Sequence, residues 1–230
     1  MPERIVVINP NSSIDVTAGI DAAMAPLRFA DGPTIDCLTL AEGPPGIETQ
    51  RHVDGVVGPL CDMIQREDNG ADAFVVACFS DPGLHSARET TARPVMGISE
   101  CAITTALTLG ERFGIMAILP ASVARHKRYI RQMGLEGRLA GDRPIGVGVT
   151  GLNADGAEDE VEGRMTAVGR QLIEDDGADV LIMGCAGMAR YRRRLEDTLG
   201  VPVIDPSQAA VAQAIAAVRL GYRNNKTNLE

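Results

Sequence analysis

The chain reads Gly70-Ala71-Asp72-Ala73-Phe74-Val75-Val76-Ala77-Cys78 and, farther on, Gly177-Ala178-Asp179-Val180-Leu181-Ile182-Met183-Gly184-Cys185. In both stretches an apolar run follows Gly-Ala-Asp and ends at a cysteine eight residues after the glycine. An apolar run without alternation, bounded by turn residues, is typical of a strand that is buried on both faces of a parallel sheet. The two stretches therefore predict equivalent strands in two similar halves.

The similarity extends to both sides of these strands. Glu3-Arg4 opens an earlier apolar run and Glu111-Arg112 opens its counterpart, Pro10 and Ser12 match Pro120 and Ser122, and Pro94-Val95 matches Pro202-Val203. All of these matches share an offset of about 108 residues. Several matches in one register indicate an internal duplication.

Short β-branched runs alternate with longer amphipathic runs, which predicts βαβ units. We expect strands at residues 5–8, 35–40, 73–77, 95–98, 113–119, 145–149, 180–183 and 203–204. We expect helices near residues 13–25, 50–68, 83–91, 100–110, 122–133, 158–176, 188–199 and 207–220. The predicted fold is α/β, with two pseudo-symmetric parallel-sheet halves. Ligands of such sheets bind beyond the carboxyl ends of the strands, so Cys78 and Cys185 are expected to flank one cleft between the halves.

Composition and charge narrow the range of partners. The 230 residues carry a formal net charge of −9, which disfavours nucleic acid and anionic membranes as partners. No apolar run approaches the roughly 20 residues that span a bilayer, and a predicted strand begins without a preceding signal peptide. The five cysteines are scattered and form no CxxC pair, which favours reduced thiols in the cytoplasm. A small-molecule substrate is the remaining expectation.

Two thiols that face one cleft are suited to inverting a carbon acid, because one removes a proton from one face while the other supplies a proton to the opposite face. A thiolate is accessible near neutral pH when the cysteine precedes a helix, and the residues after Cys78 and Cys185 predict such entries. The competing interpretation is that both are buried strand-end cysteines. For Cys37, Cys61 and Cys101, packing is the preferred interpretation.

Three other patterns are set aside. Residues 146–151 match GxGxxG, but these glycines interrupt an expected strand and no helix opens after them, so nicotinamide binding is not expected. His52, His85 and His126 lack ligand spacing, and no metal site is predicted. The basic cluster at residues 190–194 is interpreted as a solvated helix face, with substrate or subunit contact as the alternative.

The chain resembles the hydantoin racemase branch of the aspartate/glutamate racemase superfamily along nearly its whole length. The resemblance is carried by Ile-Asn-Pro-Asn-Ser-Ser at 8–13, Gly-Ile-Glu-Thr at 46–49, Ala-Cys-Phe-Ser-Asp-Pro-Gly-Leu at 77–84, Pro-Val-Met-Gly-Ile at 94–98, Gly-Cys-Ala-Gly-Met at 184–188 and Pro-Val-Ile-Asp at 202–205. The two cysteine motifs are the specific ones.

The resemblance implies two Rossmann-like (flavodoxin-like) halves with the site between them. The first half would comprise residues 1–97, with the last helix at 206–230 packing back onto it, and the second residues 98–205. It also implies a reaction without a cofactor, in which Cys78 and Cys185 transfer the proton. Its implied substrate-contacting residues are Asn9, Phe79, Ser80, Ala186 and Gly187.

One departure concerns the end of the fifth strand. Relatives often present a Thr or Tyr hydroxyl there, whereas this chain has Leu119, so Ser122 is the candidate replacement.

The motif details favour a neutral five-membered ring, a 5-substituted hydantoin or allantoin, because Phe79 and Ala186-Gly187 replace the hydroxyls of the Asp and Glu racemases. Racemisation of aspartate or glutamate and cis–trans isomerisation of a maleate-type dicarboxylate stay open. Two cysteines argue against an arylmalonate decarboxylase, which keeps only the second. The non-enzymatic alternative is a duplicated α/β module that binds a small molecule, and a homo-oligomer is the expected assembly.

Overall fold

The computed structural model describes residues 3–154 and 156–224 and contains two parallel sheets of four strands each. Strand order is β2-β1-β3-β4 in the first sheet and β6-β5-β7-β8 in the second, and every pairing is parallel. The identical order confirms the α/β prediction of two similar halves. The strands are β1 Arg4–Asn9, β2 Thr34–Thr39, β3 Ala73–Val76, β4 Val95–Gly97, β5 Phe113–Ala117, β6 Leu139–Pro144, β7 Val180–Met183 and β8 Val203–Ile204.

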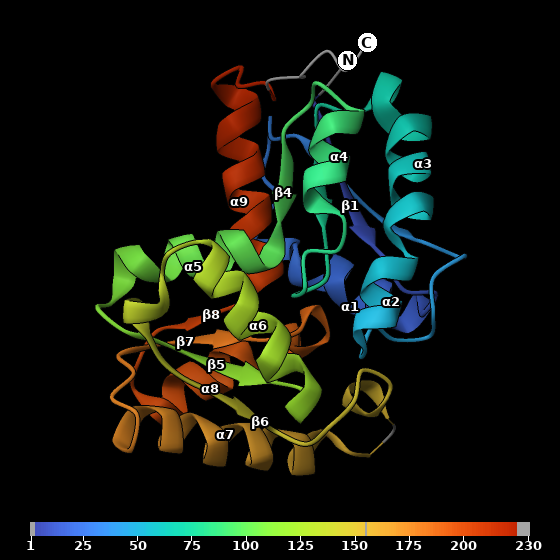
Figure 1. Cartoon of the computed structure of the whole chain (residues 1–230). Coiled ribbons are helices and arrows are strands. Elements are labelled where there is room, and N and C mark those ends of the chain that lie inside the picture. Colours follow the sequence, from blue (N-terminus) through green and yellow to red (C-terminus); the bar gives the residue numbers. More distant parts are fainter. Residues whose placement is uncertain (1–2, 155, 225–230) are drawn as a thin grey trace.

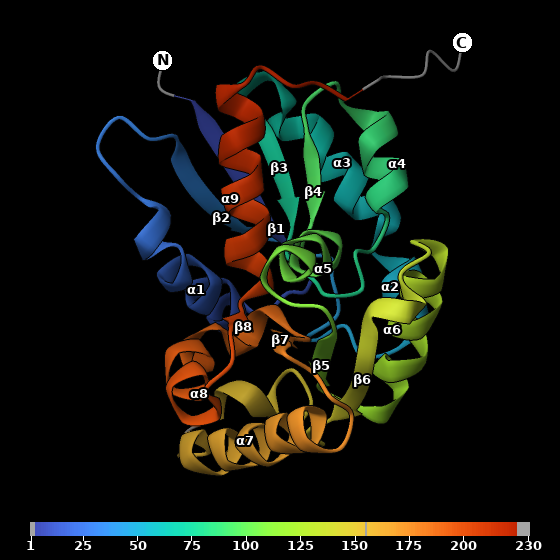
Figure 2. The same ribbon diagram turned by 90° about the vertical axis from the view of Figure 1, so that its left-hand side faces the viewer.

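Helices flank both sheets, and the two halves are stacked with α5 between them (Figures 1 and 2). The α-helices are α1 Ile14–Ala23, α2 Gln50–Gly55, α3 Val57–Glu67, α4 Leu84–Thr90, α5 Ile98–Leu109, α6 Pro120–Gln132, α7 Glu158–Glu174, α8 Arg192–Leu199 and α9 Pro206–Arg219. The 3₁₀ turns are η1 Ala25–Leu27, η2 Asp68–Gly70, η3 Glu136–Arg138, η4 Gly151–Asn153 and η5 Ala186–Tyr191. No helix in the described part of the chain is long and apolar enough to cross a membrane.

The first sheet is buried on both faces. Successive side chains of a strand point to opposite faces, and in β1 each face packs in a different core cluster. Ile5 and Val7 of β1 join one core cluster, and Val6 and Ile8 join another, against α3 and α4. All four side chains are fully buried. This explains why the strand is apolar without alternation.

The repeated Gly-Ala-Asp motif holds neighbouring strands in register. Asp72 accepts a hydrogen bond from the backbone N–H of Arg4 at 2.9 Å, and Asp179 accepts from Glu111 and Arg112 at 2.8 and 3.0 Å. Each aspartate thus ties the start of the cysteine-bearing strand to the start of the adjacent strand. The motif occurs in both halves, and in each its aspartate accepts a hydrogen bond from the backbone of the adjacent strand.

The last helix packs on the first sheet, although it follows the second half in sequence. Helix α9 contacts β1, β3 and β4 and also runs along α5, as Figure 2 shows. Its buried face includes Ala210, Val211 and Ala214. The part of the predicted 206–230 segment beyond Asn224 lies outside the described residues.

One predicted strand is wrong. Residues 145–149 form a loop, and the strand beside β5 is β6, which carries Asp142 and Arg143 and is only half-buried along most of its length. Gly146 has φ +76°, which turns the chain out of the sheet. Ile145 and Val149 are apolar because they are buried as loop residues, whereas β6 is an edge strand that tolerates polar side chains.

Two predicted helices are divided. The segment 50–68 breaks at Val56 into α2 and α3, and the segment 188–199 begins as the 3₁₀ turn η5 before α8.

Candidate active site

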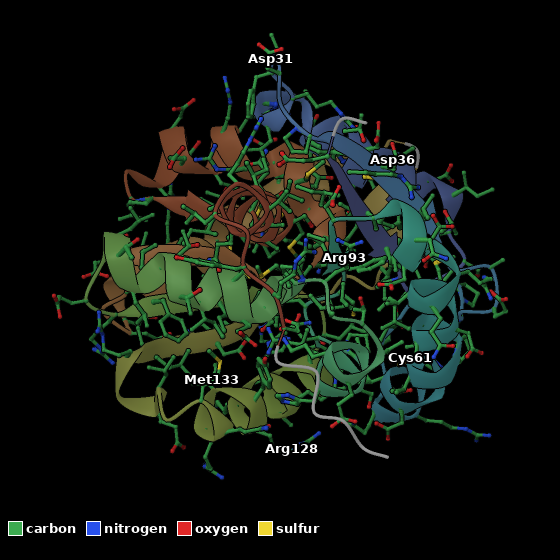
Figure 3. All side chains as sticks on the ribbon, turned by 90° about the horizontal axis from the view of Figure 1, so that it is seen from above. Asp31, Asp36, Cys61, Arg93, Arg128 and Met133 are labelled. Carbon is green, nitrogen blue, oxygen red and sulfur yellow. The ribbon has the colours of Figure 1, made fainter. Side chains whose placement is uncertain are left out.

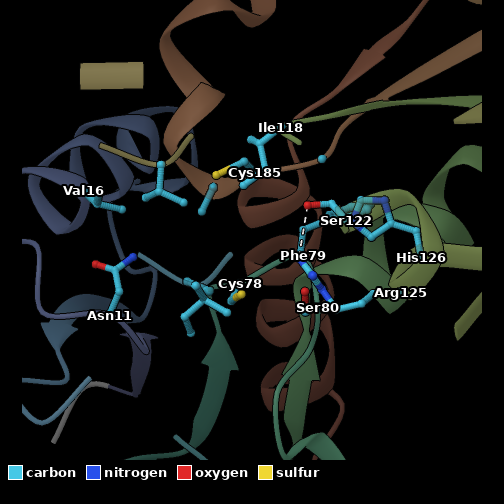
Figure 4. Close-up of a pocket in the computed structure, with 15 residues that line it drawn as sticks. Asn11, Val16, Cys78, Phe79, Ser80, Ile118, Ser122, Arg125, His126 and Cys185 are labelled. Atoms are coloured by element: carbon cyan, nitrogen blue, oxygen red, sulfur yellow. Dashed lines mark hydrogen bonds between the residues drawn. The ribbon is translucent and has the colours of Figure 1, made fainter. Parts of the chain in front are cut away.

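Cys78 and Cys185 line one pocket between the two halves, as predicted from the repeat. Cys78 lies two residues beyond β3, and Cys185 lies two residues beyond β7, at the N-terminal boundary of η5. Figure 4 shows the two side chains entering the pocket from opposite halves, and both are partly buried. The pocket has about 430 Å³ of empty volume.

Burial controls the acidity of both thiols. Desolvation raises the pKa of Cys78 to about 12 and that of Cys185 to about 11. The backbone N–H of Ser80 bonds Cys78, the N–H of Gly187 bonds Cys185, and both bonds favour the thiolate. The turn after each cysteine thus acts as expected, but burial outweighs it.

One face of α6 forms the wall opposite the cysteine loops. Ser122, Arg125 and His126 all line the pocket and are spaced at i, i+3 and i+4, the spacing of one helical face. Ser122 was predicted, whereas Arg125 and His126 were not. The helical spacing from Ser122 was the signal that could have found them.

Arg125 is a buried cation, 9% exposed. Its Nη1 donates to the carbonyl of Ala121 and its Nη2 to the hydroxyl oxygen of Ser122, each at 3.1 Å. Its Nε is buried and has no hydrogen-bond partner among the described residues. Desolvation lowers the Arg125 pKa, and the nearby positive charge lowers the pKa of Cys78.

His126 fixes the aromatic side of the pocket. Its Nδ1 lies 3.0 Å from Oδ2 of the fully buried Asp142 in β6. The His126 ring meets the Phe79 ring edge to face, with centroids 5.0 Å apart. Phe79 is thus held in place by a chain of contacts that begins in the second sheet.

Asp81 anchors the Cys78 loop. Its carboxylate accepts the backbone N–H groups of Ser99 and Glu100 at 2.9 and 2.8 Å, at the start of α5. The usual capping position of α5 is Gly97, which has no side chain, so the loop supplies the cap. Asp81 itself has φ +42°, and burial raises its pKa to about 7. Asp81 belongs to the motif at 77–84, but the sequence did not indicate its capping role.

Two loops from opposite halves meet at the pocket. Ile47 and Val149 both line it, and Oε1 of Glu48 accepts the backbone N–H of Val149 at 2.8 Å. This bond joins the first half to the loop at 145–149.

The predicted substrate-contacting residues divide into two groups. Phe79, Ser80, Ser122 and Ala186 line the pocket. Asn9 does not: it is 1% exposed, and its amide nitrogen donates to Asn11, Ser13 and Thr17. Asn11 lines the pocket in its place, with its side chain held by Asn9. Gly187 lines a separate hollow beside α1. Its backbone N–H donates a hydrogen bond to the sulfur of Cys185, which lines the pocket.

The other three cysteines lie apart from this pocket. Cys37 lies in β2, Cys101 is buried in α5, and Cys61 lies on α3 at the periphery (Figure 3). All five cysteines are free thiols. Within residues 3–154 and 156–224, no three His, Cys, Asp or Glu side chains gather as a possible metal site. The chemistry that the pocket offers is acid/base chemistry by two thiols, beside a cation and backbone N–H donors.

Known proteins share this fold and sequence over nearly the whole chain. The family model described as Asp/Glu/Hydantoin racemase matches residues 5–214. A hydantoin racemase of Paenarthrobacter aurescens is 37% identical over 98% of this chain and 95% of that protein. The structure of an allantoin racemase from Klebsiella pneumoniae superposes with a TM-score of 0.92 at 32% identity, covering 98% of this chain and 91% of that one. An allantoin racemase from Pseudomonas fluorescens gives the same TM-score at 27% identity, covering 98% and 94%.

These matches extend over both halves of the chain. This chain belongs to the Asp/Glu/Hydantoin racemase family.

Proposed function

We propose that this protein is a racemase of 5-substituted hydantoins or allantoin that uses Cys78 and Cys185 as its two acid/base groups and needs no cofactor. The observation that carries the proposal is that equivalent strand-end cysteines from both halves line one pocket. The hydantoin and allantoin racemases among its relatives support the substrate class.

The reaction needs one thiolate and one thiol. The thiolate removes the proton from the ring carbon next to the carbonyl, and the negative charge moves to the carbonyl oxygen as an enolate forms. The thiol on the opposite face then gives its proton to that carbon, which inverts it. Because the reaction runs in both directions, the two cysteines exchange roles.

The surroundings of each sulfur suit these roles. The N–H groups of Ser80 and Gly187 stabilise whichever sulfur carries the negative charge. Burial makes each thiolate a strong base, since a raised pKa increases its affinity for the proton. Ser122, Asn11 and the backbone of Ala186 offer polar contacts to the amide groups of a ring.

The test is a pair of single variants, Cys78→Ser and Cys185→Ser, assayed by optical rotation and by solvent-deuterium exchange. Each should abolish racemisation, while each still exchanges the α-proton of one enantiomer only. The matched control is Cys61→Ser, which lies outside the pocket and should retain wild-type activity.

Full racemisation by either active-site variant would overturn the two-base assignment. Substrate turnover without deuterium in the recovered substrate would instead indicate addition and elimination, the chemistry of a cis–trans isomerase.

The proposal includes two expectations about the protein in solution. Five free thiols suit a reducing compartment such as the cytoplasm, and a homo-oligomer is the expected assembly because most soluble oligomers are symmetric homo-oligomers.

A further inference from the structure

A second hollow adjoins the pocket that holds the two thiols. It has about 540 Å³ of empty volume and shares Phe79, Ser80, Arg125 and His126 with the first pocket. Beyond this shared wall it reaches Arg128 and Gln132 on α6 and Gln50 at the start of α2. A group attached to a ring between the thiols would have this polar space beside it.

The second hollow is positively charged. Arg125 and Arg128 line it, and none of the described residues that line it is a carboxylate. This contrasts with the chain as a whole, in which 31 acidic residues outnumber 22 basic ones. The positive charge of this hollow is therefore opposite in sign to the net charge of the chain.

Neither arginine forms an ion pair within the described part of the chain. Arg125 bonds only a carbonyl and a hydroxyl, and its Nε is buried without a partner. Arg128 donates to Oε1 of Gln50 at 2.7 Å, a neutral acceptor. The nearby Glu48 raises the Arg125 pKa, but its Oε1 is engaged by Val149.

Two unpaired cations at i and i+3 on one helix repel each other, and burial of one of them adds a cost. An anion placed between them would offset both effects. In Figure 4 the guanidinium of Arg125 points toward the Ser80 and Ser122 side of the pocket, and Figure 3 places Arg128 at the periphery. The deep cation can hold the anion while the outer one attracts it.

We propose that Arg125 and Arg128 form a subsite for a carboxylate on the substituent of the reacting carbon, so that the preferred substrate is a 5-carboxyalkyl hydantoin. This inference rests on the proposed function, because it places the ring between Cys78 and Cys185. The substituent passes Phe79 and Ser80, which form the wall common to both hollows.

The test compares 5-(2-carboxyethyl)hydantoin with its neutral isostere 5-(2-carbamoylethyl)hydantoin, with racemisation followed by polarimetry. In the wild type, kcat/KM for the acid should exceed that for the amide at least about tenfold, because a charge-assisted bond is about twice as strong as a neutral one. The difference should lie mainly in KM and shrink in high salt, which screens the exposed Arg128.

Arg128→Gln is the informative variant, because Arg128 is exposed and its loss should not unfold the chain. It should lower the acid-to-amide ratio about tenfold, a loss of one charged contact. The matched control is Arg131→Gln on the same helix, since Arg131 is 71% exposed, pairs with Glu136 and does not line the hollow. It should leave the ratio unchanged.

Racemisation of the amide with equal or lower efficiency for the acid would overturn the subsite and leave the proposed function standing. If neither a 5-substituted hydantoin nor allantoin is racemised, the proposed function fails, and calorimetric titration with the acid still decides the subsite. Binding about tenfold weaker in Arg128→Gln than in the wild type would support it, and equal affinity would overturn it.

Discussion

At the scale of single residues, the two thiols titrate under opposing influences. Burial favours the neutral thiol and a backbone N–H bond favours the thiolate, and burial prevails at both Cys78 and Cys185. The pKa values of about 12 and 11 leave little thiolate at neutral pH. Under the proposed mechanism, activity then depends on the minor, thiolate form of these cysteines.

The first prediction concerns pH. In the proposed mechanism the base is a thiolate whose pKa is raised, so kcat/KM should increase with pH, by about tenfold per unit between pH 7 and 9. The measurement is racemisation of a hydantoin methylated at the imide nitrogen, so that the substrate does not titrate in this range. A flat profile would show that the free enzyme already holds a thiolate.

The repeat identified both cysteines from sequence because core packing alone does not require a thiol at the end of both equivalent strands. The family resemblance implied Asn9, but the motif contains both Asn9 and Asn11, and the structure places Asn11 at the pocket while Asn9 bonds Thr17 of α1. Arg125 was missed because it is one of several basic residues on an amphipathic helix, where arginines are usually solvated. Its burial depends on how α6 meets a loop from the other half.

At the scale of elements, Asp81 joins the Cys78 loop to the start of α5. The second prediction is that Asp81→Ala lowers the free energy of unfolding by about 1–3 kcal/mol, because two backbone N–H groups at Ser99 and Glu100 lose their acceptor. It should also reduce kcat, since the loop that positions Cys78 loses its anchor.

Urea denaturation and steady-state kinetics measure the two effects. Asp81→Asn keeps one acceptor oxygen and should fall between wild type and alanine. The control is Asp62→Asn, because Asp62 is exposed on α3. It should change neither the free energy of unfolding nor kcat. Normal stability of Asp81→Ala would contradict the capping role.

Gly184 marks where the end of β7 approaches β5. A Cβ added there would lie 2.7 Å from the carbonyl oxygen of Met116 and 3.1 Å from Cα of Ala117, both backbone atoms. The third prediction is that Gly184→Ala costs about 1–3 kcal/mol of stability and displaces the adjacent Cys185, lowering kcat. Gly163→Ala, where no atom lies within 4 Å of an added Cβ, is the control. Unchanged melting of Gly184→Ala would show that the strand end yields without cost.

The sequence predicted the central strands well because both their faces are buried. It failed at the edge of the second sheet, where β6 carries Asp142 and Arg143 and the apolar run that follows is a loop. Apolar residues indicate burial, not secondary structure. Here the edge strand β6 is partly polar, whereas the buried loop after it is apolar, so the loop was mistaken for the strand.

At the scale of the whole molecule, one core cluster extends through both halves. It includes Ile5 and Val7 of the first sheet, Ile182 of the second, and Ala210 and Val211 of α9. The halves therefore share their interior, and we expect thermal unfolding to be a single transition, with equal calorimetric and van't Hoff enthalpies. Two resolved transitions would contradict this coupling.

The fourth prediction tests α9 as the connector. Ala214→Glu places a carboxylate in the shared core and should cost more than about 3 kcal/mol, or prevent folding. Ala216→Glu, an exposed position on the same helix, should change stability by no more than about 0.5 kcal/mol. Circular dichroism melts of both variants provide the comparison, and equal melting of the two would contradict the burial of this helix face.

The position of α9 also has a consequence for biosynthesis. Its residues leave the ribosome after those of β1, β3 and β4, the strands that it covers. Until then the nascent amino-terminal sheet presents an apolar surface for which a chaperone has time to compete. Premature termination after β8 would yield a product in which the apolar face that α9 covers is exposed.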